Sequence, residues 1–529
     1  MMKILLLILL PLIFSFSYAK NDSLENVIEI QVQKFKNILE VVSANYYKEN
    51  IDISKISENA FNSLLQSLDK FSTYFNASQY EKIKDAFKGS GEGIGVQFFR
   101  RGDSLMVFNV LKGSPADSVG LTVGDRIIYI NHEYFVGKDA QSAYRKISES
   151  QNKKCILTIK RGGFLKEVEV PIAETQIPSV VASVEFKGTS VGLIKLTRFS
   201  LSTFSEFTRA FDSLVKIGCK RFIIDLRGNQ GGYLDETVKL VELFLKKGDT
   251  IVVVSGREVH RKVYICEKDG KYKRYPLIVL VDKNSASASE IFASAMQDND
   301  RAIVVGERTF GKGLVQRTWE FKDGSAFRLT TGEYVSPLGR NIQKPDVENV
   351  DLGAFADLTL GKEQKEMIEE LIKKTGGATN LPIYYTKKGR ALFGGGAVVP
   401  DYFFQYDTLP PYLNKLKNNG LLNDFVLRYF FDNQQNYLEI SKLNFQNFLF
   451  KFEVSDMVMS SFKQYLMQTN SYLEKYFDEE YYRIKSEIKA TLGYILFGDS
   501  GYFSTLLLQD TIIGKVQNLF GEAEKLVQQ

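Results

Sequence analysis

The sequence predicts a multidomain α/β protein with a helical segment at each end, and three observations support this. Apolar, β-branched runs at 277–281 and 302–306 flank a helix-like segment, which is typical of buried strands in a parallel sheet. A glycine-rich segment with short strand-like runs lies upstream, at 89–172. At 529 residues the chain is too long for one hydrophobic core, so we expect three or four domains.

The first residues have the features of a secretory signal. Lys3 precedes a largely apolar block from Ile4 to Phe16, and Ser17-Tyr18-Ala19 is a small-x-small pattern suited to signal peptidase. We therefore expect residues 1–19 to be a signal peptide and the mature protein to be exported, to the periplasm or cell envelope. The alternative is an uncleaved anchor, although the apolar block is shorter than the ~20 residues that a membrane span needs.

Composition argues against several classes of function. A net charge of +5 on this length gives little support for a polyanionic partner, so no nucleic acid is expected. The histidines His132 and His260 and the three cysteines lack the spacing of metal ligands, so no metal or other cofactor is expected. We expect Cys155, Cys219 and Cys266 to be buried free thiols.

Four regions follow the signal segment. Residues 20–88 read as helical, because apolar residues from Ile28 to Val42 recur at steps of three and four. Residues 89–172 form a small β-rich domain, and residues 173–405 an α/β domain in which a buried strand at 221–227 enters a glycine-rich turn. Residues 406–529 are rich in Phe, Tyr and Leu and predict amphipathic helices, packed on the core or on a partner subunit.

The junction after the strand at 277–281 is the candidate catalytic segment. Small residues from Asn284 to Ser289 precede a helix, and a serine there exposes its hydroxyl at a helix N-terminus, where N–H groups favour a developing negative charge. A serine nucleophile usually uses a histidine, but neither histidine lies near this segment. A lysine can be the base instead if burial lowers its pKa, and Lys312 lies between two glycines, close to Phe310 and Leu314.

These residues closely resemble the carboxyl-terminal processing (tail-specific) proteases, which use a Ser-Lys dyad assisted by a glutamine. The resemblance covers Asn284 to Ile291, then Gly311-Lys312-Gly313 and Gln316. In that family the lysine follows the serine by 25 positions and the glutamine follows four later, and this register selects Ser287, Lys312 and Gln316 as catalytic residues. The resemblance also implies a Clp-protease/crotonase-like core with an inserted PDZ domain.

The turn after the strand at 221–227 is a candidate oxyanion hole. Asp225-Leu226-Arg227-Gly228-Asn229-Gln230-Gly231-Gly232 resembles the family's "DLRGNPGG". Two glycines after a strand can turn a backbone N–H toward a carbonyl oxygen beside the nucleophile. We expect one donor from Gly231 or Gly232 and the other from the Ala288 N–H; the alternative is a tight turn without function.

The β-rich domain resembles a circularly permuted bacterial PDZ domain. Such domains capture a peptide's C-terminus: the peptide adds a strand, and loop N–H groups bind its carboxylate. Gly93, Ile94, Gly95 and Val96 are the expected carboxylate-binding loop. The alternative, a nucleotide phosphate loop, lacks both the expected glycine spacing and a following βαβ unit.

The resemblance therefore implies a serine endopeptidase that captures protein C-terminal tails through its PDZ domain and cleaves exported proteins. Its partners would be proteins or peptides with accessible C-termini, and an activating adaptor and a homo-oligomer stay open. Two alternatives belong to other classes. One is a catalytically silent PDZ scaffold of the cell envelope, and the other is an acyl-transfer enzyme acting on small thioesters.

Overall fold

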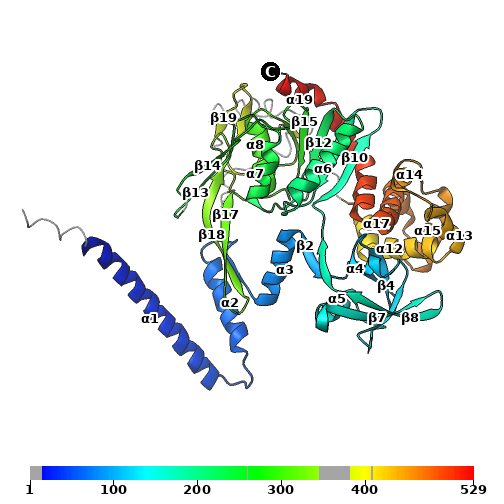
Figure 1. The fold of residues 1–529 in the computed structure, drawn as a ribbon, viewed down its shortest axis with the longest axis horizontal. Coiled ribbons are helices and arrows are strands. Elements are labelled where there is room, and N and C mark those ends of the chain that lie inside the picture. The colour runs from blue at the N-terminus through cyan, green and yellow to red at the C-terminus, as the bar shows by residue number, and fades with distance from the viewer. Residues whose placement is uncertain (1–14, 259, 345–381, 407–408, 529) are drawn as a thin grey trace, which may run out of the picture. The chain divides into compact units, whose positions relative to one another are not determined.

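The computed structural model describes residues 15–258, 260–344, 382–406 and 409–528, which form two compact units. One unit contains residues up to Tyr80 together with Arg317–Thr330, and the other contains Glu81–Gln316 and Thr331–Gln529. Figure 1 shows the elements of the second unit, which include a mixed α/β core, a small β domain and a helical C-terminal region. The fold class expected from the sequence is therefore confirmed.

The core of the second unit is a six-stranded sheet in the order β10-β11-β12-β15-β16-β21. Its strands are β10 (Val180–Phe186), β11 (Val191–Leu196), β12 (Arg221–Asp225), β15 (Leu277–Val281), β16 (Ile303–Gly306) and β21 (Tyr402–Phe403). Strands β11 to β21 pair in parallel, whereas β10 is antiparallel. Every residue of β15 is buried, as its apolar run predicts, because helices cover both faces of the sheet.

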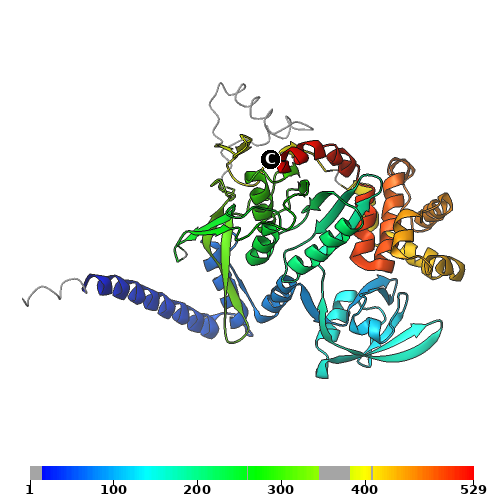
Figure 2. The same cartoon turned by 45° about the horizontal axis from the view of Figure 1, so that its top comes forward.

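Helices from distant parts of the sequence cover the two faces of this sheet. One face packs against α6 (Thr203–Lys216), α7 (Leu234–Glu242) and α8 (Ala288–Asp298). The other face packs against α18 (Thr511–Gln517) and α19 (Phe520–Val527), drawn in red at the top of Figures 1 and 2. The helices α18 and α19 thus cover one face of the core sheet.

The small β domain has a sheet in the order β3-β4-β5-β7-β8, with β6 paired to β5 and a separate β2-β9 pair. The domain also contains the helices α4 (Pro115–Ser118) and α5 (Ala140–Ser148) and a short 3₁₀ turn at Gln151–Lys153. Its strands are β2 (Ser90–Gly93), β3 (Val96–Arg101), β4 (Ser104–Val110), β5 (Arg126–Ile130), β6 (Glu133–Tyr134), β7 (Lys154–Arg161), β8 (Phe164–Pro171) and β9 (Ala173–Gln176).

The C-terminal helices form a core of their own and also pack on the β domain. Phe425 and Phe462 lie in the region where the sequence predicts amphipathic helices, and both are buried there with ring centroids 4.8 Å apart. Phe108 of β4 joins this cluster, and the Asn109 side chain donates to the Tyr494 carbonyl at 2.8 Å. The helices are α11 (Pro411–Asn418), α12 (Leu421–Val426), a π-helical turn (Leu427–Phe431), α13 (Gln434–Ile440), α14 (Phe445–Phe450), α15 (Asp456–Gln468), α16 (Glu474–Glu479) and α17 (Tyr481–Leu508).

The N-terminal region is helical, as expected, with one short strand. Its elements are α1 (Ser15–Asn45), α2 (Ile53–Gln66), β1 (Thr73–Phe75) and α3 (Ala77–Lys88). The remaining strands come from later in the chain: β13 (Thr250–Gly256), β14 (Lys262–Ile265), β17 (Leu314–Glu320), β18 (Ala326–Val335), β19 (Ile383–Tyr385) and β20 (Ala391–Phe393). In the first unit β1 pairs with residues 326–328 of β18. None of the described helices is long and apolar enough to span a membrane. Residues 1–14 of the expected signal peptide lie outside the described residues.

All three cysteines are buried and unpaired, which confirms the expectation of structural thiols. Burial raises the pKa of Cys155 and Cys219 to about 11 and that of Cys266 to about 12. These thiols are therefore protonated at neutral pH and poor nucleophiles.

Candidate active site

The candidate catalytic loops meet at one edge of the core sheet. β12 and β15 are parallel neighbours, with Asp225 opposite Leu280, so both strands end at the same edge. The glycine-rich loop follows β12, and the serine-rich loop follows β15 and enters α8. Ligands commonly bind outside the carboxyl ends of parallel strands, which makes this edge the expected place for a reaction.

Ser287 differs from the neighbouring serines in its backbone conformation. Its φ of 54° and ψ of −113° are rare for a residue with a side chain, and such strain is concentrated at functional sites. Ser285 and Ser289 are fully buried and donate to the carbonyls of Leu226 and Asn229, at 2.9 and 2.8 Å. These two serines hold the glycine-rich loop, whereas half-buried Ser287 occupies the strained turn before α8.

A buried carboxylate, Glu290, links the loop of Ser287 to the loop of Lys312. One oxygen accepts the backbone N–H groups of Ser287, at 2.8 Å, and Lys312, at 2.9 Å. The other accepts the Thr309 hydroxyl, at 2.6 Å, and the Gly311 N–H, at 2.7 Å. Because a single oxygen accepts from both, the Ser287 and Lys312 backbones lie on either side of one atom. Burial raises the pKa of the Glu290 carboxyl, and its hydrogen bonds offset that rise only in part.

Tyr334 makes a second link between the same two residues. Its buried hydroxyl contacts the backbone carbonyl of Ser287, at 3.1 Å, and that of Lys312. Burial, followed by the nearby charge of Glu290, raises the pKa of Tyr334 well above its usual value, so the hydroxyl stays a donor. Glu290 thus holds the N–H groups of Ser287 and Lys312, and Tyr334 holds their carbonyls.

The half-buried Lys312 side chain is oriented by Gln316. The Lys312 amine donates to Gln316 Oε1 at 2.9 Å. The flanking glycines allow residues 343–344 to pass close to the backbone, since a Cβ at Gly311 would lie 2.4 Å from the Lys344 side chain. A Cβ at Gly313 would lie 2.4 Å from the Gln343 nitrogen. The Gly-Lys-Gly pattern therefore reflects close backbone packing on both sides of the lysine.

Gly231 lies directly against the Ser287 turn. A Cβ at Gly231 would lie 2.9 Å from both the Ser287 Cβ and the Ala288 nitrogen. The Gly231 N–H donates to Asn229 Oδ1 at 2.9 Å, whereas the N–H groups of Gly232 and Ala288 have no acceptor among the residues described. In this conformation, the unengaged donors are therefore those of Gly232 and Ala288.

The start of the glycine-rich loop is fixed by a buried ion-pair network. Although burial alone would raise it, Arg227 and Lys195 hold the pKa of the Asp225 carboxyl well below its usual range. Arg227 Nη2 donates to Asp225 at 2.7 Å, and Arg227 Nη1 donates at 2.7 Å to Asp510, which precedes α18. The Asp-Leu-Arg part of the motif therefore anchors the loop to the C-terminal helices.

The four residues expected to bind a carboxylate lie in the small β domain, away from this chemistry. Gly93 ends β2, Val96 begins β3, and Ile94 and Gly95 form the connection between these strands. Gly-Asp-Ser-Gly at 498–501, which superficially matches a trypsin-like signature, lies inside α17 at a kink where Gly498 has a φ of 64°. These residues therefore lie within a helix of the C-terminal region, and not in the candidate active site.

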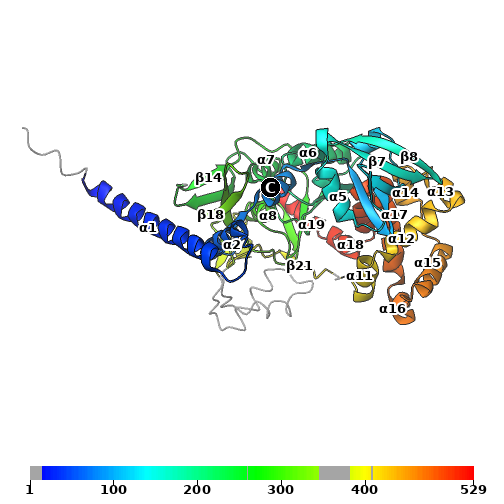
Figure 3. The ribbon, with the colours of Figure 1, turned by 90° about the horizontal axis from the view of Figure 1, so that it is seen from below.

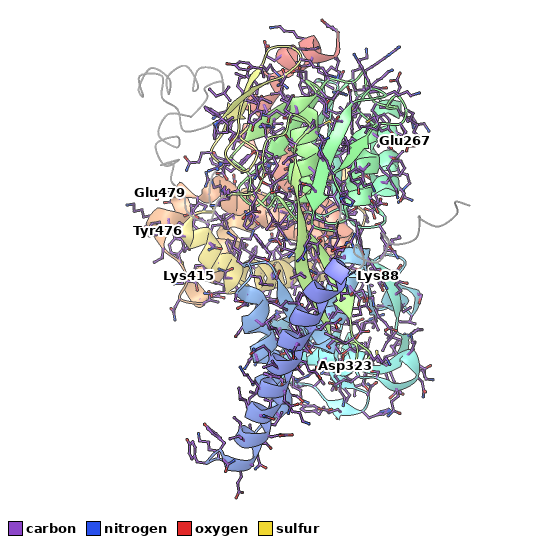
Figure 4. All side chains as sticks on the ribbon, turned by 90° about the vertical axis from the view of Figure 1, so that its left-hand side faces the viewer. Lys88, Glu267, Asp323, Lys415, Tyr476 and Glu479 are labelled. Atoms are coloured by element: carbon purple, nitrogen blue, oxygen red, sulfur yellow. The ribbon has the colours of Figure 1, made fainter. Side chains whose placement is uncertain are left out.

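Two surface pockets lie elsewhere in the second unit. One, of about 630 Å³, lies among the C-terminal helices and is lined by residues that include Lys415, Tyr476 and Glu479, all labelled in Figure 4. The other, of about 460 Å³, lies between the β domain and the helices. Neither pocket is lined by Ser287 or Lys312, so neither belongs to the candidate active site.

The sequence did not predict a role in the site for Glu290, Tyr334 or Asn229. A signal existed for Glu290, because Ser287-Ala288-Ser289-Glu290 matches the capping-box pattern, in which the acidic side chain reaches back to the serine N–H. No local pattern indicates that the same carboxylate also reaches Lys312, or that Tyr334 approaches from β18.

Three segments of the chain match models of protein families. Residues 190–349 match the model of peptidase family S41, residues 93–172 match the PDZ domain, and residues 412–498 match a family of unknown function, DUF8443. The carboxy-terminal processing protease CtpA of Bacillus subtilis is 33% identical over 60% of this chain and 67% of its own length. A probable CtpA-like serine protease of Staphylococcus aureus is 32% identical over 66% of this chain and 70% of its own length.

A solved structure of a photosystem II D1 C-terminal processing protease is 24% identical over 59% of this chain and 86% of its own, with a TM-score of 0.34. The sequence matches define a serine peptidase that carries a PDZ domain. The chain belongs to peptidase family S41, as a carboxyl-terminal processing serine peptidase.

Replacing Gly231 by alanine is expected to lower kcat for peptide hydrolysis at least ~100-fold, because the new methyl collides with the Ser287 turn. Gly228→Ala is the matched control. Gly228 has a φ of 74° but open space around its Cβ position, so it carries only the backbone cost of about 1–2 kcal/mol. Steady-state kinetics and thermal unfolding of both variants make the comparison. Equal kcat in the two variants would show that the collision has no catalytic consequence.

Proposed function

We propose that Ser287 is the nucleophile of this peptidase and Lys312 its general base, with Gln316 orienting the Lys312 amine. The observation that carries the proposal is the shared acceptor: one Glu290 oxygen receives the backbone N–H of both Ser287 and Lys312. The strained Ser287 turn and the 2.9 Å bond between Lys312 and Gln316 support the same assignment. The hydroxyls of Ser285 and Ser289 instead donate to the backbone carbonyls of Leu226 and Asn229.

The reaction proceeds through an acyl-enzyme. Neutral Lys312 takes the Ser287 hydroxyl proton as Oγ forms a bond to the scissile carbonyl carbon. The C–N bond then breaks, and Lys312 gives that proton to the leaving amine. Water, activated by the same lysine, hydrolyses the ester and releases the second product with Ser287 restored.

The developing oxyanion requires N–H donors beside Ser287. The Ala288 N–H at the start of α8 supplies one, where the helix dipole adds to the attraction. Gly232 supplies the other in the present conformation, and Gly231 becomes available only if its N–H leaves Asn229. A single donor of this kind contributes ~3–4 kcal/mol to lowering the barrier.

The substrates are exported proteins with accessible C-terminal tails. The PDZ domain captures the terminal carboxylate at Gly93–Val96 and the remaining tail as an added strand. Location in the periplasm or cell envelope follows from the signal-like residues 1–19. An activating adaptor and a homo-oligomer are compatible with this function.

The alternative functions fit fewer features. A silent PDZ scaffold would have no need for a strained serine or for the carboxylate that links it to Lys312. An enzyme acting on small thioesters would have no use for a PDZ domain.

The test compares the wild type with Ser287→Ala on an unstructured protein whose C-terminus is either free or blocked. We expect the wild type to cleave the free-tailed protein, Ser287→Ala to leave it intact, and blocking to slow cleavage. Gel electrophoresis and mass spectrometry of the fragments provide the measurement. Absent cleavage in both enzymes would favour the scaffold, and hydrolysis of an acyl-coenzyme A alone would favour the thioester reaction.

A further inference from the structure

β3 is the edge strand of the PDZ sheet. In the part of the chain that the structure describes, β3 pairs only with β4, and α5 packs beside it. Figure 3 labels α5 next to the PDZ strands. An edge strand presents outward N–H and C=O groups that an extended peptide can pair with. The proposed tail capture therefore requires these outward groups of β3 to become accessible.

The loop before β3 has a fixed shape and unengaged donors. Gly95 has a φ of 76°, its carbonyl accepts the Leu111 N–H at 2.9 Å, and a Cβ there would lie 2.2 Å from the Ser114 Cβ. Among the described residues, neither the Ile94 nor the Gly95 N–H has an acceptor. Consecutive N–H groups in such a turn are suited to a carboxylate, so these donors at the start of β3 are available to the tail. The edge of β3 together with α5, where an added strand would lie, is called the PDZ groove below.

The next outward donor of β3 is not open. The Phe98 N–H donates at 2.9 Å to the Tyr144 hydroxyl of α5, and the two ring centroids are 5.4 Å apart. Phe98 follows Val96 by two residues, so both direct their backbone groups to the same edge of the strand. Phe98 is 6% exposed and fixed in the domain core, whereas Tyr144 is 42% exposed and has room to turn away.

We propose that Tyr144 determines the affinity of the PDZ groove for substrate tails, because its hydroxyl stands where the backbone carbonyl of an added strand would accept from Phe98. The inference rests on the proposed tail capture. A tail with its carboxylate at Ile94 and Gly95 brings its own carbonyl to Phe98 about two residues before its end. That carbonyl must displace the Tyr144 hydroxyl, which then returns to solvent.

This exchange makes the groove selective. A tail gains nothing from pairing with Phe98 until it has replaced an existing hydrogen bond, so a tail that offers only its carboxylate binds weakly. A tail whose side chain also packs on the Phe98 and Tyr144 rings recovers the lost contact through buried apolar surface. Because of Tyr144, a tail must therefore make more favourable contacts before it binds, although Tyr144 does not contact the bond that is cleaved.

The test uses the full chain carrying Ser287→Ala, so that bound tails stay intact, with and without Tyr144→Phe. The probe is a short fluorescein-labelled Gly/Ser peptide ending in Val-Ala-Val, with either a free carboxylate or a C-terminal amide. Fluorescence anisotropy gives Kd. We expect Tyr144→Phe to bind the free acid about three- to tenfold more tightly, since one net hydrogen bond no longer has to be broken. Tyr129→Phe, on β5 of the same sheet, is the matched control and should leave Kd unchanged.

The outcomes separate this inference from the proposed function. Preference for the free acid, with equal affinity in both Tyr144 forms or weaker binding by Tyr144→Phe, would overturn the role of Tyr144 and leave tail capture standing. Equal or absent binding of acid and amide in every variant would overturn tail capture and this inference with it. Tighter binding by Tyr129→Phe as well would show a general effect of losing a hydroxyl and would also contradict the assignment.

Discussion

Replacing Lys312 by methionine is expected to lower kcat for peptide hydrolysis at least ~10⁴-fold. Methionine keeps the apolar stem but removes the amine that would take the Ser287 proton, while Gln316 loses the donor now 2.9 Å away. Because the two residues act as a unit, the double variant with Ser287→Ala should be no slower than either single variant. Single-turnover kinetics on a tailed substrate would measure this non-additivity.

Lys312→Arg is the sharper control. Arginine keeps the positive charge and can still donate to Gln316, but it is not deprotonated at working pH and cannot act as the base. We expect it to be as inactive as Lys312→Met. The wild-type rate should climb from about pH 5 to pH 9, since only the neutral amine accepts a proton. An active arginine variant, or a flat pH profile, would exclude the role of general base.

Replacing Glu290 by glutamine is expected to lower kcat about 100-fold. The carboxylate accepts four hydrogen bonds, two at each oxygen. A glutamine amide would turn an NH₂ group toward one pair of donors, so the backbone of either Ser287 and Lys312 or of the Thr309–Gly311 turn must move. Displacements of about 1 Å near reacting groups commonly cost this much in rate.

Glu206→Gln is the matched control for Glu290→Gln. Glu206 also accepts several hydrogen bonds, from the Ser179 and Val180 N–H groups and from the Ser179 and Ser202 hydroxyls. Among the described residues, none of these hydrogen bonds reaches either candidate catalytic loop, so the Glu206 variant should lose stability, by about 1–3 kcal/mol, without a comparable loss of kcat. Similar kinetic losses in the two variants would mean that Glu290 acts only through general stability.

The pH dependence of stability provides a separate check on Glu290. Folding raises its pKa, so the stability that it contributes is fully present below the unfolded pKa and is lost as pH rises through the folded pKa. The free energy of unfolding of the wild type should therefore exceed that of Glu290→Gln most at low pH. Urea unfolding at several pH values measures the difference, and a difference that grows with pH would have the wrong sign.

Much of the fold follows from local sequence. The run at 277–281 is apolar at every position, and it forms a strand buried on both faces. The apolar residues at helical steps in the N-terminal region, and the region rich in Phe, Tyr and Leu near the C-terminus, likewise form helices. Such periodicity determines which elements form, because each element must bury a face or stripe of its own side chains. Periodicity does not identify which part of the chain packs against that face.

Motif spacing predicts Ser287, Lys312 and Gln316 as the catalytic residues, together with the glycines beside them. Composition alone could not separate Ser287 from Ser285 and Ser289, because all three lie in the same run of small residues. Tertiary contacts separate them, because the hydroxyls of Ser285 and Ser289 donate to carbonyls nearly 60 residues away in the sequence. The choice between Gly231 and Gly232 likewise depends on a side chain, that of Asn229.

The sequence by itself determined the fold class, several of the helices and strands, and the residues that resemble a Ser-Lys site. Only the tertiary structure decided that Glu290 and Tyr334 join the Ser287 and Lys312 backbones, that the last two helices cover the core sheet, and that Tyr144 occupies the edge of β3. The physical reason is the distance along the sequence between the residues that interact. Helix and strand formation depend on neighbours within a few residues, whereas these contacts join segments that meet only when the core packs.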